Sequence, residues 1–137
     1  MKKNLIRIIL AEDHLLQLEG LSALLKKFPE LNVVRSFHEP ADLLKELDTL
    51  DFDILLADLH MPGITGLDLA DELKKRKHPA KIILLTMQRG TRFMQRAEKA
   101  GVSGYLLKSI TAEDLKNVII KIHNGEIYFD PEIKKYS

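Results

Sequence analysis

The chain has 137 residues, of which 45% are hydrophobic and 30% charged, and it contains no cysteine. This composition is typical of one globular domain and excludes disordered, collagen-like and disulfide-scaffold classes, as well as thiolate metal sites. The 21 basic and 20 acidic residues give a net charge of +1, so the chain lacks the basic excess of a nucleic-acid-binding protein. No apolar run exceeds four residues and no export signal is recognisable, so we expect a cytoplasmic protein without a membrane span.

Short apolar runs alternate with longer amphipathic stretches. In chain order, the pattern predicts a strand at 5–10, a helix from 15 that ends before Pro29, a strand at 32–36, a helix at 40–47, a strand at 54–57, a helix at 66–76, a strand at 81–85, a helix at 92–99, a strand at 104–107 and a helix at 111–125. Three strand runs are almost continuously hydrophobic, as strands buried on both faces require. The alternation predicts an α/β domain with one parallel sheet, helices on both faces and right-handed crossovers.

Local signals support several of the predicted helices. Five leucines are spaced to share one face of the first helix: Leu15, Leu18, Leu21, Leu24 and Leu25. Gly101 suits a left-handed cap after the fourth helix. Thr111, followed three residues later by Asp114, forms a weak variant of the capping box before the fifth helix.

Polar residues follow four of the five predicted strands. Glu12 and Asp13 follow the first strand, Asp58 the third, Thr86 the fourth and Lys108 the fifth. Taken singly, each carboxylate or hydroxyl is explained as a helix cap, and the lysine as a surface residue. Because ligands bind at the carboxyl edge of open parallel sheets, we instead expect these side chains to converge there.

A convergent site of this kind has a definite chemistry. Three carboxylates repel one another unless a cation lies between them, and hard oxygen ligands favour Mg²⁺. Lys108 and Thr86 at the same edge would meet a phosphoryl group. Asp58 is the best candidate acceptor, because it ends a central strand and is followed by the turn residues Pro62 and Gly63.

These features resemble the response-regulator receiver domain of bacterial two-component systems. The resemblance is carried by Glu12-Asp13, Asp58 within ILLADLHMPG, Thr86 within LLTM and Lys108 within GYLLK, and it covers about residues 5–125. It implies a flavodoxin-like (βα)5 fold, which is a doubly wound five-stranded parallel sheet with strand order 2-1-3-4-5 in a single domain.

The resemblance also implies the roles of the site residues. Asp58 would be the phosphoacceptor, whose carboxylate attacks the phosphohistidine of a sensor histidine kinase. Mg²⁺ would be held by Glu12, Asp13 and Asp58. The backbone carbonyl of His60 would be a further metal ligand, and Lys108 would pair with the phosphoryl oxygens. Such a protein assists its own phosphorylation and dephosphorylation, and we do not expect another enzymatic activity.

Signalling would follow from the added charge. The Thr86 hydroxyl would move toward the phosphoryl group and Tyr105 would rotate into the vacated space, which would remodel the surface of the fourth helix, fifth strand and fifth helix. From its position alone, Tyr105 is instead explained as a half-buried core aromatic.

Many receivers have proline after the lysine, whereas Ser109 follows Lys108 here. Since a cis bond without proline costs about 3 kcal/mol, we expect a trans peptide.

Two phrases resemble the NarL/LuxR-type regulators, AEDH at 11–14 and HNGEIYFDPEI at 123–133. In that subclass a linker joins the receiver to a helix-turn-helix DNA-binding domain, so the resemblance implies transcription regulation. We divide the chain into a receiver at 1–125 and, at 126–137, a tail or the start of a linker to an absent DNA-binding domain. The implied partners are the kinase, a second copy on phosphorylation, and DNA through the absent domain; a natural single-domain receiver is the alternative.

Other interpretations stay open. An Asp-nucleophile phosphatase needs a second acid two residues after its nucleophile, where this chain has His60. A pseudo-receiver would act only as a binding module. His14 and His60 flank the carboxylates, which leaves a transition-metal site as an alternative. The basic residues Arg89, Arg92, Arg96 and Lys99 favour a solvated face of the fourth helix over a dimer contact.

Overall fold

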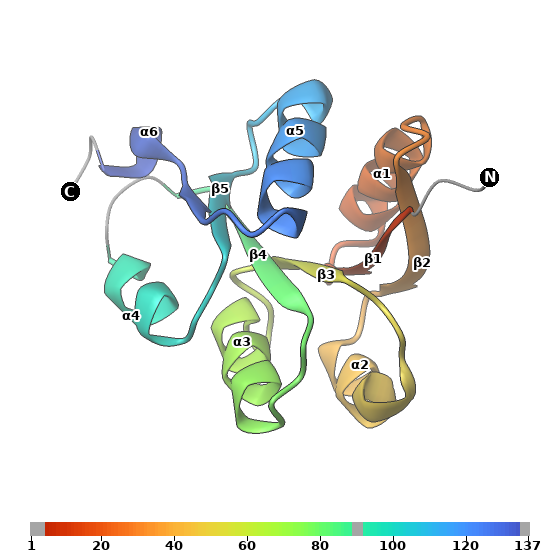
Figure 1. Cartoon of the computed structure of the whole chain (residues 1–137). Coiled ribbons are helices and arrows are strands. Elements are labelled where there is room, and N and C mark those ends of the chain that lie inside the picture. Colours follow the sequence, from red (N-terminus) through yellow and green to blue (C-terminus); the bar gives the residue numbers. More distant parts are fainter. Residues whose placement is uncertain (1–4, 89–91, 135–137) are drawn as a thin grey trace.

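The computed structural model describes residues 5–88 and 92–134. Its helices and strands are β1 (Ile6–Ala11), α1 (Leu15–Lys26), β2 (Leu31–Phe37), α2 (Pro40–Glu46), the 3₁₀ helix η1 (Leu47–Thr49), β3 (Ile54–Asp58), α3 (Gly66–Lys75), β4 (Lys81–Thr86), α4 (Met94–Lys99), β5 (Gly104–Leu107), α5 (Ala112–His123), β6 (Tyr128–Phe129) and α6 (Pro131–Lys134). The helices lie on both faces of one sheet (Figure 1). None of the helices in the described part of the chain is long and apolar enough to cross a membrane.

The sheet is parallel throughout, in the order β2-β1-β3-β4-β5-β6. This confirms the predicted fold class and the order of the first five strands, and it adds β6 beside β5. All five residues of β3 are buried, as a central strand covered on both faces requires. The register pairs Ala11 with Ala57, Asp58 with Leu85 and Thr86 with Leu107, so the carboxyl ends of β1, β3, β4 and β5 meet at one edge.

Two apolar layers hold the helices to the sheet. The cluster on one face includes Leu43 of α2, Leu67 and Leu73 of α3, and Met94 and Ala97 of α4. The cluster on the other face combines α1 and α5, and its helical members are Leu18, Leu25, Leu115, Val118, Ile119 and Ile122. Figure 1 shows the same division, with α1 and α5 together and α2, α3 and α4 opposite.

The apolar face of α1 is buried only in part. Leu18 and Leu25 are buried, whereas Leu15 and Leu24 are 55% and 43% exposed. Leu21 is half-buried at the opening between α1 and α5. The five leucines therefore do not form one buried stripe, and part of the face lines a groove beside the functional site.

The predicted helix ends are mostly confirmed. Gly101 has a φ of +76°, the left-handed conformation expected after α4, although α4 begins two residues later than predicted, at Met94. The Thr111 side chain accepts a hydrogen bond from the Asp114 amide. A complete capping box occurs instead at α3, where Thr65 and Asp68 each bind the other's backbone amide.

Residues 126–134 continue the fold beyond α5. Gly104 pairs with Tyr128 and Tyr105 with Phe129 in the sheet, and Ile133 of α6 is fully buried. Two residues are too short a strand to show alternation, so the sequence carried no strand signal there. The domain boundary at 125 stays a prediction, and residues 135–137 lie outside the described residues.

Candidate functional site

Three carboxylates converge at the carboxyl edge of the sheet. Glu12 and Asp13 directly follow β1, and Asp58 is the last residue of β3. Glu12 is only 4% exposed and Asp58 only 6%. One ligand atom from each of Glu12, Asp13, His14 and Asp58 lies within 4.8 Å of the others. The expected convergence of these three carboxylates is therefore present, and His14 joins them.

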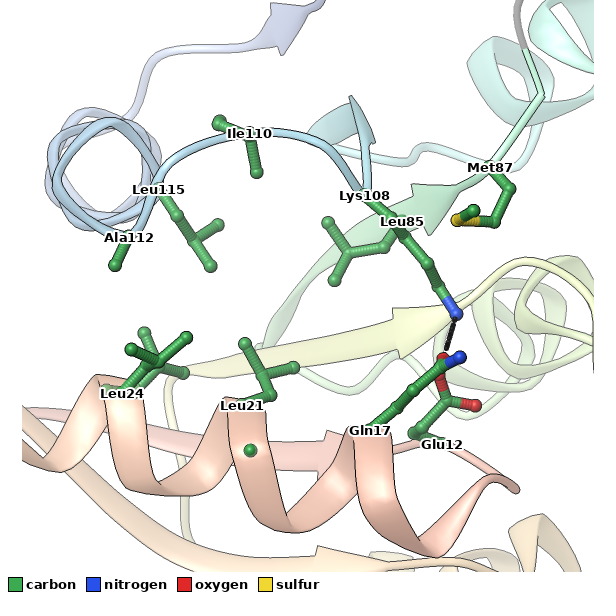
Figure 2. A pocket seen from close by; sticks show the side chains of 12 residues that line it. Glu12, Gln17, Leu21, Leu24, Leu85, Met87, Lys108, Ile110, Ala112 and Leu115 are labelled. Atoms are coloured by element: carbon green, nitrogen blue, oxygen red, sulfur yellow. Dashed lines mark hydrogen bonds and ion pairs between the residues drawn. The ribbon is translucent and has the colours of Figure 1, made fainter.

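The Lys108 ammonium neutralises part of this cluster. Its Nζ donates a hydrogen bond to Glu12 Oε1 at 2.6 Å and forms an ion pair with Asp58 Oδ2 at 3.1 Å. It also donates to Gln17 Oε1 of α1 at 2.9 Å (Figure 2). Burial alone would lower the pKa of Lys108, but the hydrogen bonds and charges of Glu12 and Asp58 raise it above its usual value. The ammonium thus stays charged, with three oxygen acceptors for its three hydrogens.

The acidic cluster fits a hard cation. Asp13 Oδ1 is buried and accepts no hydrogen bond within the described residues, although His14 Nδ1 lies 3.3 Å away. A buried carboxylate oxygen without a donor is costly unless a cation or water meets it. Glu12, Asp13 and Asp58 are therefore the residues that would hold Mg²⁺.

The two histidines near the cluster differ in position. His14 Nδ1 lies 3.3 Å from both Glu12 Oε2 and Asp13 Oδ1, so it could add a nitrogen ligand for a transition metal. The His60 ring instead contacts Phe93 edge-on, with centroids 5.3 Å apart. The backbone amide of His60 donates to Asp58 Oδ1 at 3.2 Å, which helps fix the carboxylate. The role of the His60 carbonyl as a metal ligand stays a prediction.

Gly66 lets the first turn of α3 approach the backbone of Asp58. A Cβ atom at Gly66 would lie 2.6 Å from the Asp58 carbonyl oxygen and 2.7 Å from Leu84 Cδ2. Real Cβ atoms do not come this close, so any other residue here would displace α3 or the end of β3.

Comparison with known proteins decides the family. Residues 8–120 match the sequence profile described as the response regulator receiver domain. The chain belongs to this family.

The chain is similar in sequence to the receiver part of several transcriptional regulators. DesR of Bacillus subtilis (strain 168), a transcriptional regulatory protein, is 38% identical over 129 residues, which are 94% of this chain and 64% of DesR. The nitrate/nitrite response regulator NarL of Escherichia coli (strain K12) is 30% identical over 120 residues, 88% of this chain and 56% of NarL. The chain therefore spans less than two-thirds of the length of these regulators. The resemblance to the NarL/LuxR-type subclass is confirmed.

Solved structures of response regulators have the same fold as this chain. A LuxR-family two-component response regulator from Aurantimonas sp. SI85-9A1 has a TM-score of 0.87 at 29% identity, covering 95% of this chain and 93% of that one. The isolated receiver domain of RcsB from Salmonella enterica serovar Typhimurium, solved with the phosphomimetic BeF₃⁻, has a TM-score of 0.84 at 27% identity, covering 95% and 96%.

The two predicted switch residues of the receiver share one face of the sheet. Leu84 pairs with Tyr105 across β4 and β5, and residues two apart on a strand point to the same side, so Thr86 and Tyr105 lie on the same face. Both are only 1% exposed. Thr86 Oγ1 accepts a hydrogen bond from the Gln88 amide at 3.1 Å. Tyr105 is fully rather than half-buried, and its burial raises the pKa of its hydroxyl.

The basic residues near α4 have local partners. Arg96 Nη2 lies 3.4 Å from Asp71 and 3.5 Å from Asp68, both on α3. The Arg92 guanidinium lies 5.2 Å from the ring centroid of Phe93. Arg89 lies outside the described residues. These contacts favour a solvated helix face with local ion pairs.

The sequence analysis predicted no contact for two residues near the site. Gln17 reaches Lys108 from α1, and Phe129 stacks on Tyr105 from β6 with ring centroids 5.7 Å apart. Gln17 lies in the first turn of α1, and no sequence signal marked its contact with Lys108. Phe129 is an aromatic residue in a segment that reads as a tail, so its contact with Tyr105 depends on the tertiary fold.

An apolar groove of about 400 Å³ begins at Lys108 and continues between α1 and α5. Figure 2 shows Leu21 and Leu24 of α1 facing Ile110 and Leu115, with Glu12, Gln17 and Lys108 at one end. The site is therefore buried on the sheet side and borders an apolar surface on the α1 side.

Proposed function

We propose that this receiver is a phosphorylation-activated switch, with Asp58 accepting a phosphoryl group from a sensor histidine kinase in the cytoplasm. The observation that carries the proposal is the pairing of the buried Asp58 carboxylate with Lys108 at 3.1 Å, beside Glu12 and Asp13. A nucleophilic carboxylate, a fixed cation and a second cation site are the components that phosphoryl transfer to a carboxylate needs.

The chemistry is a displacement at phosphorus. A carboxylate oxygen of Asp58 forms the new P–O bond while the P–N bond of a phosphohistidine breaks, and the histidine nitrogen keeps the electron pair. Lys108 neutralises charge on the transferred oxygens, for which it must leave Glu12 or Gln17. When bound between Glu12, Asp13 and Asp58, Mg²⁺ supplies further positive charge for those oxygens.

The same groups support loss of the phosphoryl group to water, so the chain assists its own dephosphorylation without another enzymatic activity. An Asp-nucleophile phosphatase is the weaker candidate. The residue two positions after Asp58 is His60, whose ring packs against Phe93, so it supplies no carboxylic acid for a leaving group.

The output is a change around Tyr105 that controls dimerisation and transcription. Thr86, buried at the end of β4, would turn its hydroxyl toward the phosphoryl group, and Tyr105 would follow it on the same sheet face. The α4-β5-α5 surface would change as a result. DNA would be bound by a domain outside this chain, which is supported by the solved complexes of RcsB dimers with DNA, at 27% identity.

Incubation with a small acyl phosphate and Mg²⁺ tests this function. The chain should take up one stable phosphoryl group, and Asp58→Asn should abolish uptake while the exposed control Asp114→Asn leaves it unchanged. Continuous release of phosphate from many phosphoesters would indicate a phosphatase. Absence of uptake would indicate a pseudo-receiver and contradict the proposal.

A further inference from the structure

The chain's own C-terminal segment covers Tyr105. We call residues 126–134 the strap. The Asp130 amide donates to the Tyr105 carbonyl and the Tyr128 amide to the Ser103 carbonyl, both at 2.9 Å. The Phe129 ring lies on the Tyr105 ring with a centroid distance of 5.7 Å and an interplanar angle of 12°. Both the backbone and the ring of Tyr105 are therefore engaged by the strap.

The far end of the strap is anchored in the core. Ile133 is fully buried in the same apolar cluster as Met94 and Ala97 of α4, and Phe129 packs against that cluster. Asp130 Oδ1 accepts a hydrogen bond from the Glu132 amide and so fixes the start of α6. Figure 1 places α6 and α4 at the same end of the sheet. The strap thus closes the β5 edge and its neighbouring helix face.

A rotation of the Tyr105 ring would break this stack. Tyr105 is 1% exposed and its ring lies nearly parallel to that of Phe129, so turning the Tyr105 ring out of this plane would separate the two rings. Separation removes the aromatic contact and uncovers the apolar surface beneath Phe129. Without the ring contact, only the two backbone hydrogen bonds from Tyr128 and Asp130 would hold the strap, and so short a strand pairing is weak by itself.

We infer that the strap is a latch on Tyr105, which is held by the Phe129 stack in the unphosphorylated receiver and released when Asp58 is phosphorylated. This inference rests on the proposed switch function. It adds a structural change, the release of the strap, by which phosphorylation of Asp58 would affect a binding partner. While the strap is docked, β6 is paired with the edge of β5. A partner protein therefore cannot bind to this edge or to the neighbouring face of α4. Release frees both the edge and the strap.

Linkage makes the latch reciprocal. If a phosphoryl group loosens the strap by some factor, then loosening the strap strengthens binding of a phosphoryl mimic by the same factor. A residue with only a structural role would not produce this gain. Phe129 is accordingly a positioning residue for Tyr105, although it lies far along the chain from the acidic cluster.

The experiment uses beryllofluoride with Mg²⁺ as the phosphoryl probe on the whole chain. Hydrogen exchange is followed at the Tyr128 and Asp130 amides, with and without the probe, and beryllofluoride affinity is measured for wild type, Phe129→Ala and Phe129→Leu. The control is Ile127→Ala, which truncates another apolar side chain of the strap. Ile127 is 72% exposed, so its loss should not affect the contact with Tyr105.

We expect the probe to lower protection of both amides about tenfold or more. Phe129→Ala should bind beryllofluoride about fivefold or more tightly, Phe129→Leu should fall between it and wild type, and Ile127→Ala should match wild type. Binding of the probe with unchanged amide protection and unchanged affinity in Phe129→Ala would overturn the latch and leave the switch function intact. If wild type does not bind the probe and takes up no phosphoryl group, the proposed function fails and the latch fails with it.

Discussion

Lys108 lies closer to Glu12 than to Asp58, with Nζ distances of 2.6 Å and 3.1 Å. The ammonium therefore sits between a residue that would hold the metal and the residue that would accept the phosphoryl group. It compensates the negative charge of these carboxylates, and it would have to shift to meet a transferred phosphoryl group. This position has two opposite consequences for substitution.

Replacement of Lys108 by methionine should separate metal binding from phosphoryl uptake. Removal of a positive charge from the acidic cluster should strengthen Mg²⁺ binding, because the cation no longer competes with the ammonium. Loss of the fixed charge should slow uptake from a small acyl phosphate about 100-fold. Calorimetric Mg²⁺ titration and the uptake rate measure the two effects. Weaker Mg²⁺ binding in Lys108→Met would contradict this account of the cluster.

The hydrogen bond from Lys108 to Gln17 should slow phosphoryl uptake, because it keeps the ammonium away from the phosphoryl group. Gln17→Leu removes the 2.9 Å acceptor and frees Lys108 for the phosphoryl group, whereas Gln17→Glu adds a charged acceptor and retains it. Since one hydrogen bond contributes about 1 kcal/mol, uptake should rise a few-fold in the first variant and fall a few-fold in the second. Ala23→Glu, at an exposed position of α1, controls for added charge. Equal rates in the two Gln17 variants would rule out this role.

Two glycines should respond to alanine in opposite directions. Gly66→Ala places a Cβ atom 2.6 Å from the Asp58 carbonyl oxygen and should destabilise the fold by about 1–3 kcal/mol, with slower phosphoryl uptake. Gly20→Ala, within α1, meets no atom within 4 Å and should stabilise the fold by about 0.5–1 kcal/mol. Urea denaturation compares the two variants. An unchanged free energy of unfolding in Gly66→Ala would contradict the close approach.

The pair of Arg7 and Asp53 should make stability depend on pH. Arg7 binds Asp53 through its backbone amide at 2.8 Å and its guanidinium at 3.0 Å. Partial burial alone would raise the pKa of Asp53, but the Arg7 hydrogen bonds and charge lower it below its usual value. A lowered pKa means that this stabilisation is present above the unfolded value of about 3.9 and is lost as the pH falls through the folded value.

Asp53→Asn should therefore cost about 1–3 kcal/mol at neutral pH and progressively less in acid. Urea denaturation over a pH series measures the difference from wild type. Asp51→Asn is the control, because Asp51 also pairs with Arg7 but its side chain is 85% exposed, so its ion pair should contribute little. A difference for Asp53→Asn that does not shrink in acid would exclude Asp53 as the source of the pH dependence.

The sequence pattern predicted a parallel α/β sheet and the residues of its acidic edge because both depend on local pattern, whereas the strand order was implied by the resemblance to receiver domains. Continuous apolar runs such as 54–57 mark buried strands, and the residue after each strand is placed by topology alone. Local geometry was also predictable at Lys108, where the structure has a trans peptide, as it does throughout the described residues.

What the sequence could not show depends on contacts between distant segments. Gln17 and Lys108 are 91 positions apart, and no spacing rule joins them. Thr65 and Asp68 have the same spacing as Thr111 and Asp114, so the sequence pattern did not show which pair forms the complete capping box. β6 has only two residues and therefore shows no periodicity, so the sequence left open whether Tyr128 and Phe129 anchor the tail against the domain, and it did not predict the contact of Phe129 with Tyr105.

The proposed switch depends on Asp58 as the residue that accepts the phosphoryl group. Its most direct test is peptide mass spectrometry of the chain after incubation with a small acyl phosphate and Mg²⁺, with hydroxylamine treatment to identify an acyl phosphate. We predict one hydroxylamine-sensitive phosphoryl group, confined to the peptide that contains Asp58 and absent when the metal is chelated. A phosphoryl group on His14, His60 or any residue other than Asp58, or none at all, would contradict the account.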